Sequence, residues 1–110
     1  GWLKLTDDIS QEIPPEILEI SERVFKKPIY SCFTEEFEKY IKENKINKLY
    51  FVGIDIDCCI LKSATDSFER NIPLEVLSNY CASNGGDRSF DAALTVMTRM
   101  IGNNNINKEL

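Results

Sequence analysis

The sequence predicts an α/β fold, in which a mostly parallel sheet is covered by helices. Segments that favour strands alternate along the chain with segments that favour helices, which is typical of a parallel sheet with covering helices. The helical segments carry apolar residues at helical spacing, so one face of each can pack on the sheet. The chain of 110 residues is long enough for one small domain with a core, and we expect residues 1–110 to form that domain.

The first part of the chain shows little periodic pattern. We expect residues 1–15 to be an irregular lead-in, although Pro14 and Pro15 could begin a short helical turn. Residues 23–25 are a short candidate strand, which the lysines and proline of residues 26–28 end. Residues 30–33 then predict a loop.

A helix is predicted after this loop. Thr34 is a suitable N-cap, and two glutamates follow it in the first turn. We expect the helix to end near Asn44. The apolar residues of one face recur at helical spacing: Phe37, Tyr40 and Ile41.

The middle of the chain predicts a strand, a helix and a second strand. Residues 48–54 have the composition of a buried strand. Residues 59–70 predict a helix, with apolar residues at four-residue steps at Ile60, Ala64 and Phe68. Residues 74–77 predict a short strand.

The C-terminal part predicts a turn, a long helix and an edge strand. Residues 83–86 form the turn, Asp87 can cap the helix, and Gly102 stops it. Residues 103–106 lead into a final edge strand. One stripe of the helix is expected in the core: Phe90, Ala93, Leu94, Met97 and Ile101.

Composition narrows the classes of function. The formal net charge is -5 and basic residues are scattered, which argues against a nucleic-acid partner. The chain shows neither an apolar stretch long enough to span a membrane nor a signal-peptide pattern, so we expect a cytoplasmic protein without a membrane partner. The chain has no histidine, so the commonest general base and transition-metal ligand are missing. We therefore expect no metal and no cofactor, and any chemistry must use Cys, Lys, Asp, Glu or Tyr.

Cysteine use suggests reduced thiols. The neighbours Cys58 and Cys59 rarely bond to each other, because a disulfide at that spacing is strained. The cysteine spacings match no zinc pattern, so thiols in a cytoplasmic protein are expected. Cys59 lies at the junction of a predicted strand and a predicted helix. Open α/β sheets bind ligands at that edge, and a helix N-terminus stabilises a thiolate. Taken alone, however, a cysteine at a strand end is more often a small buried hydrophobe.

Three segments of the sequence resemble motifs of one family. Residues 53–60, followed by residues 63–68, resemble the nucleophile motif of the isochorismatase-like cysteine hydrolases. That superfamily includes nicotinamidases and N-carbamoylsarcosine amidases. Residues 27–33, here called the lysine loop, resemble its Lys-x-x-Tyr-Ser-Ala-Phe segment, and residues 76–83 resemble its next strand and loop. The resemblance runs from about Glu16 onward and implies a Rossmann-like, three-layer α-β-α fold.

The resemblance assigns roles to three residues. Cys59 would be the nucleophile and would attack a carbonyl carbon to give a thioester. Lys27 would support the thiolate and assist proton transfer. The oxyanion hole would consist of the backbone N–H groups of Asp55 and Cys59. The family also has a non-proline cis peptide bond in this loop, which would join Ile54 and Asp55.

Other residues near these motifs have more ordinary explanations. We expect Tyr30, Phe33 and Ile54 to line the pocket, but core packing explains Phe33 about equally well. Asp57 and Asp66 are expected to cap or brace local structure. Structural roles are also expected for the remaining cysteines, Cys32, Cys58 and Cys81.

The sequence departs from the family pattern in two places. Ile56 replaces the motif threonine, which removes a local hydroxyl hydrogen bond. The family begins with an apolar strand that ends in a general-base aspartate, and no such strand precedes Lys27 in this sequence. We therefore expect the chain to be the C-terminal portion of a longer hydrolase that lacks the N-terminal strand-helix portion.

Three functions are compatible with this pattern. The first is a cysteine hydrolase of small amides or related carbonyl compounds, whose partners are a small-molecule substrate and either the missing N-terminal segment, a homo-oligomer, or both. The second is a non-catalytic domain of the same fold that acts in assembly or ligand binding. The third is a flavodoxin-like binding domain without thiol chemistry, which leaves the pairing of Lys27 with Cys59 unexplained.

Overall fold

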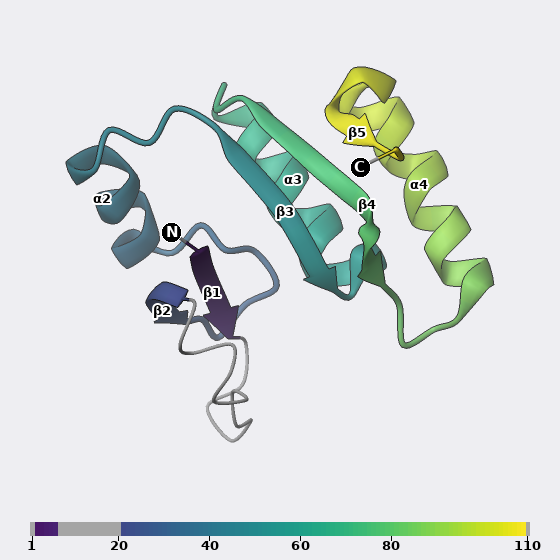
Figure 1. Ribbon diagram of the computed structural model, residues 1–110, viewed down its shortest axis with the longest axis horizontal. Helices are drawn as coiled ribbons and strands as arrows, with labels where there is room; N and C mark the ends of the chain where they lie inside the picture. The colour runs from purple at the N-terminus through teal and green to yellow at the C-terminus, as the bar shows by residue number, and fades with distance from the viewer. Residues whose placement is uncertain (1, 7–20, 110) are drawn as a thin grey trace.

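The computed structural model describes residues 2–6 and 21–109 (Figure 1). Strands and helices alternate along most of this part of the chain. In chain order, the elements are β1 (Trp2–Thr6), β2 (Ser21–Lys26), α2 (Glu35–Glu43), β3 (Leu49–Ile54), a π-helical turn (Ile56–Ile60), α3 (Leu61–Glu69), β4 (Leu74–Ala82), α4 (Asp87–Ile101), a 3-10 turn (Asn103–Asn105) and β5 (Ile106–Asn107).

The strands pair only in parallel among the described residues. β1 pairs with β2, and β3, β4 and β5 form a second sheet with β4 in the middle. The predicted α/β class with a mostly parallel sheet is therefore confirmed. β3 and β5 are the edge strands of the three-stranded sheet, so one edge of β3 has no strand beside it within the described residues.

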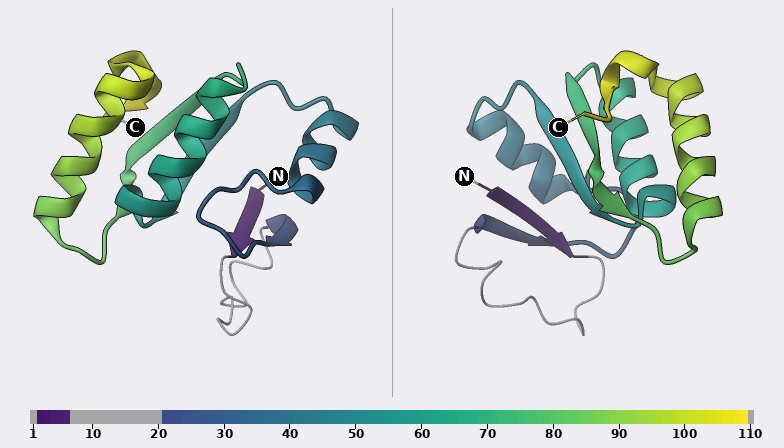
Figure 2. Two further views of the ribbon diagram at one scale, coloured as in Figure 1. Left: turned by 180° about the vertical axis from the view of Figure 1, so that it is seen from behind. Right: turned by 45° about the vertical axis from the view of Figure 1, so that its right-hand side comes forward.

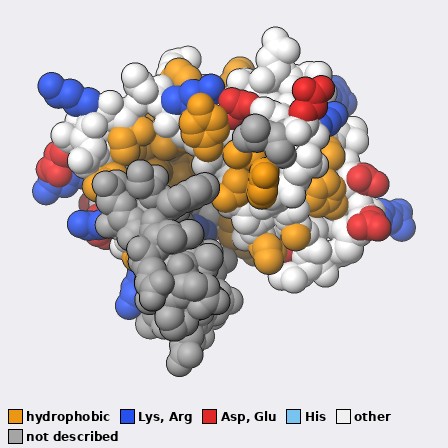
Figure 3. Space-filling model, in the orientation of Figure 1, with side chains coloured by type: hydrophobic (Ala, Val, Ile, Leu, Met, Phe, Trp, Pro, Cys, Tyr) orange, Lys and Arg blue, Asp and Glu red, His pale blue; other side chains and the backbone are white. Residues whose placement is uncertain are grey.

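Helices α3 and α4 lie on the same face of the three-stranded sheet, as the view from behind shows (Figure 2). Leu49 and Phe51 of β3 are buried, whereas the alternate side chains of Tyr50, Val52 and Ile54 are 58%, 39% and 60% exposed. The predicted buried strand is thus buried on one face only, because successive side chains of a strand point to opposite sides. Hydrophobic side chains accordingly gather at the surface over β3 and β4 (Figure 3).

A second part of the fold consists of β1, β2 and α2. Phe25 of β2 is 1% exposed and meets the rings of Phe37 and Tyr40 on α2 edge-on, at 5.3 and 5.2 Å between centroids. The buried residues of both parts form one continuous apolar cluster. The two sheets are therefore joined by side-chain packing.

The structure corrects the prediction for the N-terminus. Residues 2–6, which were expected to belong to an irregular lead-in, form β1 and pair in parallel with β2, with a register shift between Trp2 and Leu3. A short strand therefore does precede Lys27, contrary to the expectation. The run is short and carries no turn signal of its own, and its partner strand comes much later in the sequence. The turn predicted at Pro14 and Pro15 lies outside the described residues.

Most element predictions after residue 20 are confirmed. α2 has Thr34 as its N-cap, whose Oγ1 accepts a hydrogen bond from the Phe37 N–H at 3.2 Å, and it ends at Asn44. α4 ends at Gly102, where φ is +88°, a conformation that glycine adopts without a Cβ penalty. β5 is the predicted edge strand.

Four details differ from the prediction. β4 continues to Ala82, well beyond the expected residues 74–77. The cap of α4 is Gly86, so Asp87 is its first helical residue. The helix expected over residues 59–70 begins as a π-helical turn and becomes α-helical at Leu61. Phe68, expected on the buried stripe, is 45% exposed. Among the described residues, the helices are too short or too polar to cross a bilayer.

Candidate active site

Cys59 lies in a tight turn between β3 and α3. We call residues 55–60 the nucleophile turn. The peptide bond between Ile54 and Asp55 is cis, as the family resemblance implied. The carbonyl oxygen of Asp55 then accepts hydrogen bonds from the N–H groups of Cys58 and Ile60, at 3.2 and 3.1 Å. The turn is thus wound around the Asp55 carbonyl, and it holds Cys59 half-buried at the C-terminal edge of β3.

The carboxylates of the nucleophile turn connect it to the loop after β4. Asp55 Oδ1 accepts from the Asn84 N–H at 2.7 Å, and Asp57 Oδ1 accepts from Ser83 Oγ at 2.7 Å. The ligand atoms of Asp55, Asp57 and Cys58 lie within 4.8 Å of one another. Both aspartates have hydrogen-bond partners within the chain, and acidic groups near a surface often cluster without a metal. Both aspartates brace the turn.

Lys27 follows β2 directly and is only 6% exposed. Its Nζ donates hydrogen bonds to the carbonyl oxygens of Ile29 and Tyr30, each at 2.9 Å. A buried ammonium group requires such partners, because burial without them disfavours the charged form. The lysine loop therefore wraps its own backbone around the charge of Lys27.

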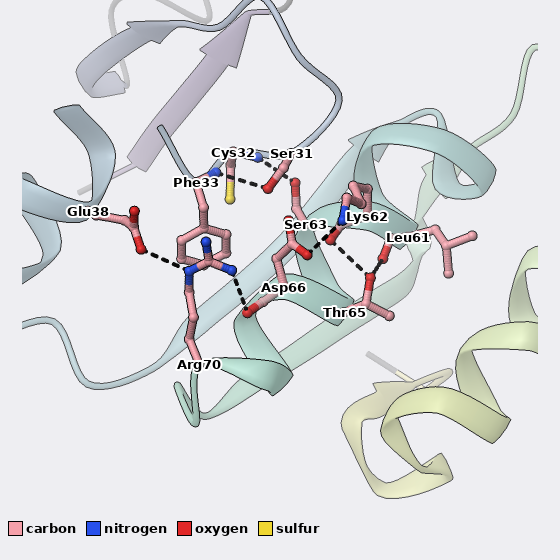
Figure 4. A network of polar contacts seen from close by, with 10 residues as sticks. All are labelled: Ser31, Cys32, Phe33, Glu38, Leu61, Lys62, Ser63, Thr65, Asp66 and Arg70. Carbon is pink, nitrogen blue, oxygen red and sulfur yellow. Dashed lines mark hydrogen bonds and ion pairs between the residues drawn. The ribbon is translucent and has the colours of Figure 1, made fainter. Parts of the chain in front are cut away.

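The lysine loop packs against α3, the helix that follows Cys59 (Figure 4). The Cys32 N–H donates to Ser63 Oγ at 2.9 Å, and the Ser31 side chain faces the Asp66 carboxylate (Figure 4). Ser31, Ser63 and Asp66 are all buried. Lys27 and Cys59 are far apart in the sequence, and these contacts bring the segments that carry them together.

Asp66 is a charged group in this contact. Burial alone would raise the pKa of its carboxyl, but hydrogen bonds from Ser31 and Lys62 and the charges of Lys62 and Arg70 lower it below its ordinary value. Lys62 Nζ donates to Asp66 Oδ1 at 3.0 Å from the exposed side of α3. Asp66 is therefore ionised at neutral pH although it is mostly buried.

The cysteines other than Cys59 have raised thiol pKa values. Burial raises the pKa of Cys32 to about 11, although its hydrogen bond with Ser63 and the charge of Lys27 act in the opposite direction. Burial, and then the charges of Asp57 and Asp55, raise the pKa of Cys58, and burial also raises that of Cys81. All three thiols are protonated at neutral pH, which makes them poor nucleophiles.

An open pocket of about 510 Å³ lies between the lysine loop and the nucleophile turn. Its lining residues are Ile29, Tyr30, Ser31, Asp57, Cys58 and Lys62. Of the three residues predicted to line a pocket, Tyr30 borders this one. Phe33 is buried and meets Phe37 edge-on at 5.7 Å, and Ile54 is exposed beside the cis peptide bond.

Several of these residues were not predicted from the sequence to line a pocket. Ser31 lies within the lysine loop, Asp57 lies two residues before Cys59, and Lys62 follows Cys59 by three residues. Proximity to the motif residues was the available signal for them. Cys59 and Lys27 are not among the lining residues: Cys59 follows Cys58 in the nucleophile turn, and Lys27 comes two residues before Ile29 at the start of the lysine loop.

Comparison with known proteins places the chain in a family. Residues 6–104 match the sequence profile of the isochorismatase domain. A curated relative, isochorismatase family protein 2A of Dictyostelium discoideum, is 31% identical over 62 residues, which are 54% of this chain and 31% of that protein. The chain thus spans about a third of the length of this relative.

Solved structures show the same fold. The nicotinamidase of Staphylococcus aureus is 17% identical with a TM-score of 0.78, over 98% of this chain and 74% of that one. An isochorismatase-like hydrolase of Alkaliphilus metalliredigens is 16% identical with a TM-score of 0.76, over 96% and 66%. A MAR1 ribonuclease of Caenorhabditis elegans is 21% identical with a TM-score of 0.75, over 89% and 51%. On the extent of the profile match, supported by this shared fold, the chain belongs to the isochorismatase domain family.

Proposed function

We propose that this chain is the cysteine-bearing part of a hydrolase that acts on small amides or related carbonyl compounds. The Cys59 thiolate attacks the carbonyl carbon, the C–N bond breaks, and the amine leaves with one proton. Water then attacks the resulting thioester, releases the carboxylic acid and returns the thiol. The substrate is a small molecule that the pocket beside Tyr30 can hold.

The observation that carries this proposal is the packing of the lysine loop on α3. The hydrogen bond from the Cys32 N–H to Ser63 Oγ joins the loop that begins at Lys27 to the helix that follows Cys59. A nearby ammonium group favours a thiolate, and burial reduces the screening of its charge by salt. Lys27 in this role supports the thiolate and assists proton transfer to the leaving amine.

The choice of Cys59 also follows from the other thiols. Cys32 is fully buried, with a pKa of about 11. Cys58 borders the pocket, but burial and two neighbouring carboxylates raise its pKa. A thiol that stays protonated at neutral pH is a weak nucleophile. Cys32 and Cys58 are therefore weak nucleophiles, and we assign the nucleophile to Cys59 because of its place in the family motif.

Backbone groups of the nucleophile turn stabilise the oxyanion in this proposal. The N–H groups of Asp55 and Cys59 donate to the oxygen that becomes negative in the transition state, which is often the largest catalytic contribution. Tyr30 forms a wall of the substrate pocket. Ile54 flanks the turn, and Phe33 supports the lysine loop from the core side.

The general base comes from outside these residues in our proposal. An N-terminal segment supplies an aspartate at the end of a strand, and the chain spans only part of its relatives. The open edge of β3 and its exposed face of Tyr50, Val52 and Ile54 are where such a segment, a second copy of the chain, or both would pack. The working protein is then an assembly in the cytoplasm, where thiols stay reduced.

Alkylation of the four cysteines tests the proposal. The intact chain is treated with iodoacetamide at neutral pH, and the rate at each cysteine is followed by peptide mass spectrometry. We expect Cys59 to react faster than Cys32, Cys58 and Cys81, and we expect Lys27→Met to slow Cys59 the most of the four. Equal, slow rates at all four thiols would contradict a nucleophilic Cys59.

A non-catalytic domain that serves assembly is the second candidate. The exposed apolar face of β3 favours it, because such a surface is typical of a contact with another chain. Both candidates require the same fold. Slow thiols together with a stable complex through β3 would support the second candidate over the first.

A further inference from the structure

We propose that Asp66 is a positioning residue for this site: it holds the lysine loop on α3 and so fixes Lys27 relative to Cys59. The inference rests on the proposed function, since it concerns how Lys27 is held for its role. Asp66 does not touch the substrate in this scheme. Its effect on Cys59 passes through Ser31 and the backbone of the lysine loop.

Asp66 lies on α3, the helix that follows Cys59. Ser63 and Asp66 follow Cys59 by four and seven residues, a spacing that places side chains along one face of a helix. Ser63 Oγ accepts from the Cys32 N–H at 2.9 Å, and the Asp66 carboxylate faces the Ser31 side chain (Figure 4). A hydrogen bond from the Ser31 hydroxyl to this carboxylate is part of the proposal, and it agrees with the lowered pKa of Asp66. The helix face that begins near Cys59 therefore carries the two groups that fasten the loop.

Ser31 is connected to Lys27 through the backbone of the lysine loop. The carbonyls that hold the Lys27 ammonium belong to Ile29 and Tyr30, the two residues directly before Ser31. The Ser31 Oγ also accepts from the Phe33 N–H at 3.1 Å. A short path thus runs from the Asp66 carboxylate through the Ser31 hydroxyl and one peptide unit to the carbonyls on Lys27.

The Asp66 side chain is mostly buried although it is charged. A carboxylate that served only an i,i+4 ion pair with Lys62 could remain exposed, as Lys62 itself is at 59%. The Asp66 side chain is only 12% exposed and is aimed at the lysine loop, where Ser31 meets it (Figure 4). Burying a charge is costly unless it makes such bonds. The contact with the loop is what accounts for the buried position.

Arg70 holds the same loop from a second point. Its guanidinium lies 4.6 Å from the ring centre of Phe33 and donates to Glu38 on α2 at 2.8 Å. It also donates to the carbonyl oxygen of Asp66 at 3.2 Å. The C-terminal half of the lysine loop is therefore held at two points, Phe33 and Ser31, and Asp66 acts at the one nearer to Lys27.

Cys59 alkylation, measured as a function of pH in the intact chain, tests the proposal. The variants are Asp66→Ala, Asp66→Asn, Ser31→Ala and Lys27→Met. Ser67→Ala is the matched control, because Ser67 is also buried on α3 but donates to the Ile72 carbonyl, away from the lysine loop. Thermal unfolding is recorded for each variant, so that a loss of stability is seen separately from a loss of reactivity.

We expect Asp66→Ala and Ser31→Ala to slow Cys59 alkylation at neutral pH about tenfold, as a displaced lysine would. The pH of half-maximal rate should rise by about one unit. Asp66→Asn should retain most of the rate, because its amide oxygen can still accept from Ser31. Ser67→Ala should leave the rate unchanged even where it lowers the melting temperature.

Several results would overturn the inference. A purely electrostatic effect has the opposite sign, because removing a negative charge makes a nearby thiolate easier to form, so faster alkylation in Asp66→Ala contradicts positioning. An equal loss in Asp66→Asn and Asp66→Ala contradicts it as well. If Lys27→Met slows Cys59 but Asp66→Ala and Ser31→Ala do not, the proposed function stands and the positioning role fails. If Lys27→Met has no effect, both fail.

Discussion

Cys32 shows how strongly burial can act on a single side chain. It belongs to the lysine loop and is fully buried against α3, and its thiol pKa is raised from 9.0 to about 11. The unfolded chain exposes the thiol, which then ionises at its ordinary pKa. Between these two values the unfolded state has lost the proton and the folded state has kept it, so stability must fall as the pH rises.

This difference predicts a pH dependence of stability that belongs to Cys32. The free energy of unfolding of the wild-type chain should decrease by up to about 3 kcal/mol more than that of Cys32→Ala as the pH rises through this range. Urea titrations from pH 8 to pH 11, in steps of about half a unit, measure both curves. Parallel curves for the two proteins would contradict a raised thiol pKa in the folded state.

Single residues of the candidate site could be predicted only in part. Lys27, Cys59 and Tyr30 were found because they occupy fixed places in short motifs. The contact between the Ser31 side chain and the Asp66 carboxylate could not be predicted in this way, because it depends on how a loop and a distant helix pack. Asp66 was expected to brace local structure, and its side chain faces Ser31 of a loop that is distant from it in sequence.

At the level of elements, helix boundaries could be predicted where a side chain hydrogen-bonds to the backbone of its own helix. Thr34 was predicted as the cap of α2, and its Oγ1 accepts from the Phe37 N–H. Elements that depend on partners far away in sequence were harder. β1 was missed because Trp2–Thr6 gains its strand form from pairing with β2. Nothing in the residues of the nucleophile turn signals a π-helical turn.

The strand prediction for β3 illustrates a further ambiguity. The run of apolar residues has the same composition whether one or both faces are covered, since β-branched and aromatic residues favour strands in either case. The structure distinguishes the two: Phe51 is buried and Tyr50 and Val52 are not. Sequence reasoning alone could not assign the exposed face.

The N-cap of α2 allows a test at the same scale. Thr34→Ala should lower the free energy of unfolding by about 1 kcal/mol, because one N–H at the helix start loses its partner. Chemical denaturation measures the change. Thr95→Ala is the control: Thr95 is an exposed residue within α4 whose Oγ1 donates to the Asp91 carbonyl, and its loss should have a smaller effect. An equal loss in both variants would contradict the capping role.

At the scale of the whole molecule, the exposed face of β3 is the main departure from an ordinary domain surface. It carries Tyr50, Val52 and Ile54 side by side with an open strand edge. Proteins usually cover such edges or protect them with charge. This agrees with the proposal that another segment or another copy of the chain packs there.

A charge placed on this face should therefore disturb assembly. Val52→Lys should lower the sedimentation coefficient of the native material, because a lysine at the centre of an apolar contact must be desolvated. Val96→Lys is the matched control, since Val96 is 42% exposed on α4, close to the 39% of Val52. Sedimentation velocity compares the two variants with the wild type. An unchanged coefficient in Val52→Lys would argue against a contact through β3.

The hydrogen bond between the Cys32 N–H and Ser63 Oγ has a consequence for observing this protein. That amide is paired with a side chain of another element, so it is protected from solvent only while the lysine loop lies on α3. Its exchange with deuterium therefore measures how often the loop opens. The fold thus contains a built-in reporter of the closed arrangement, which can be read in the unmodified chain and compared with the reactivity of Cys59 under the same conditions.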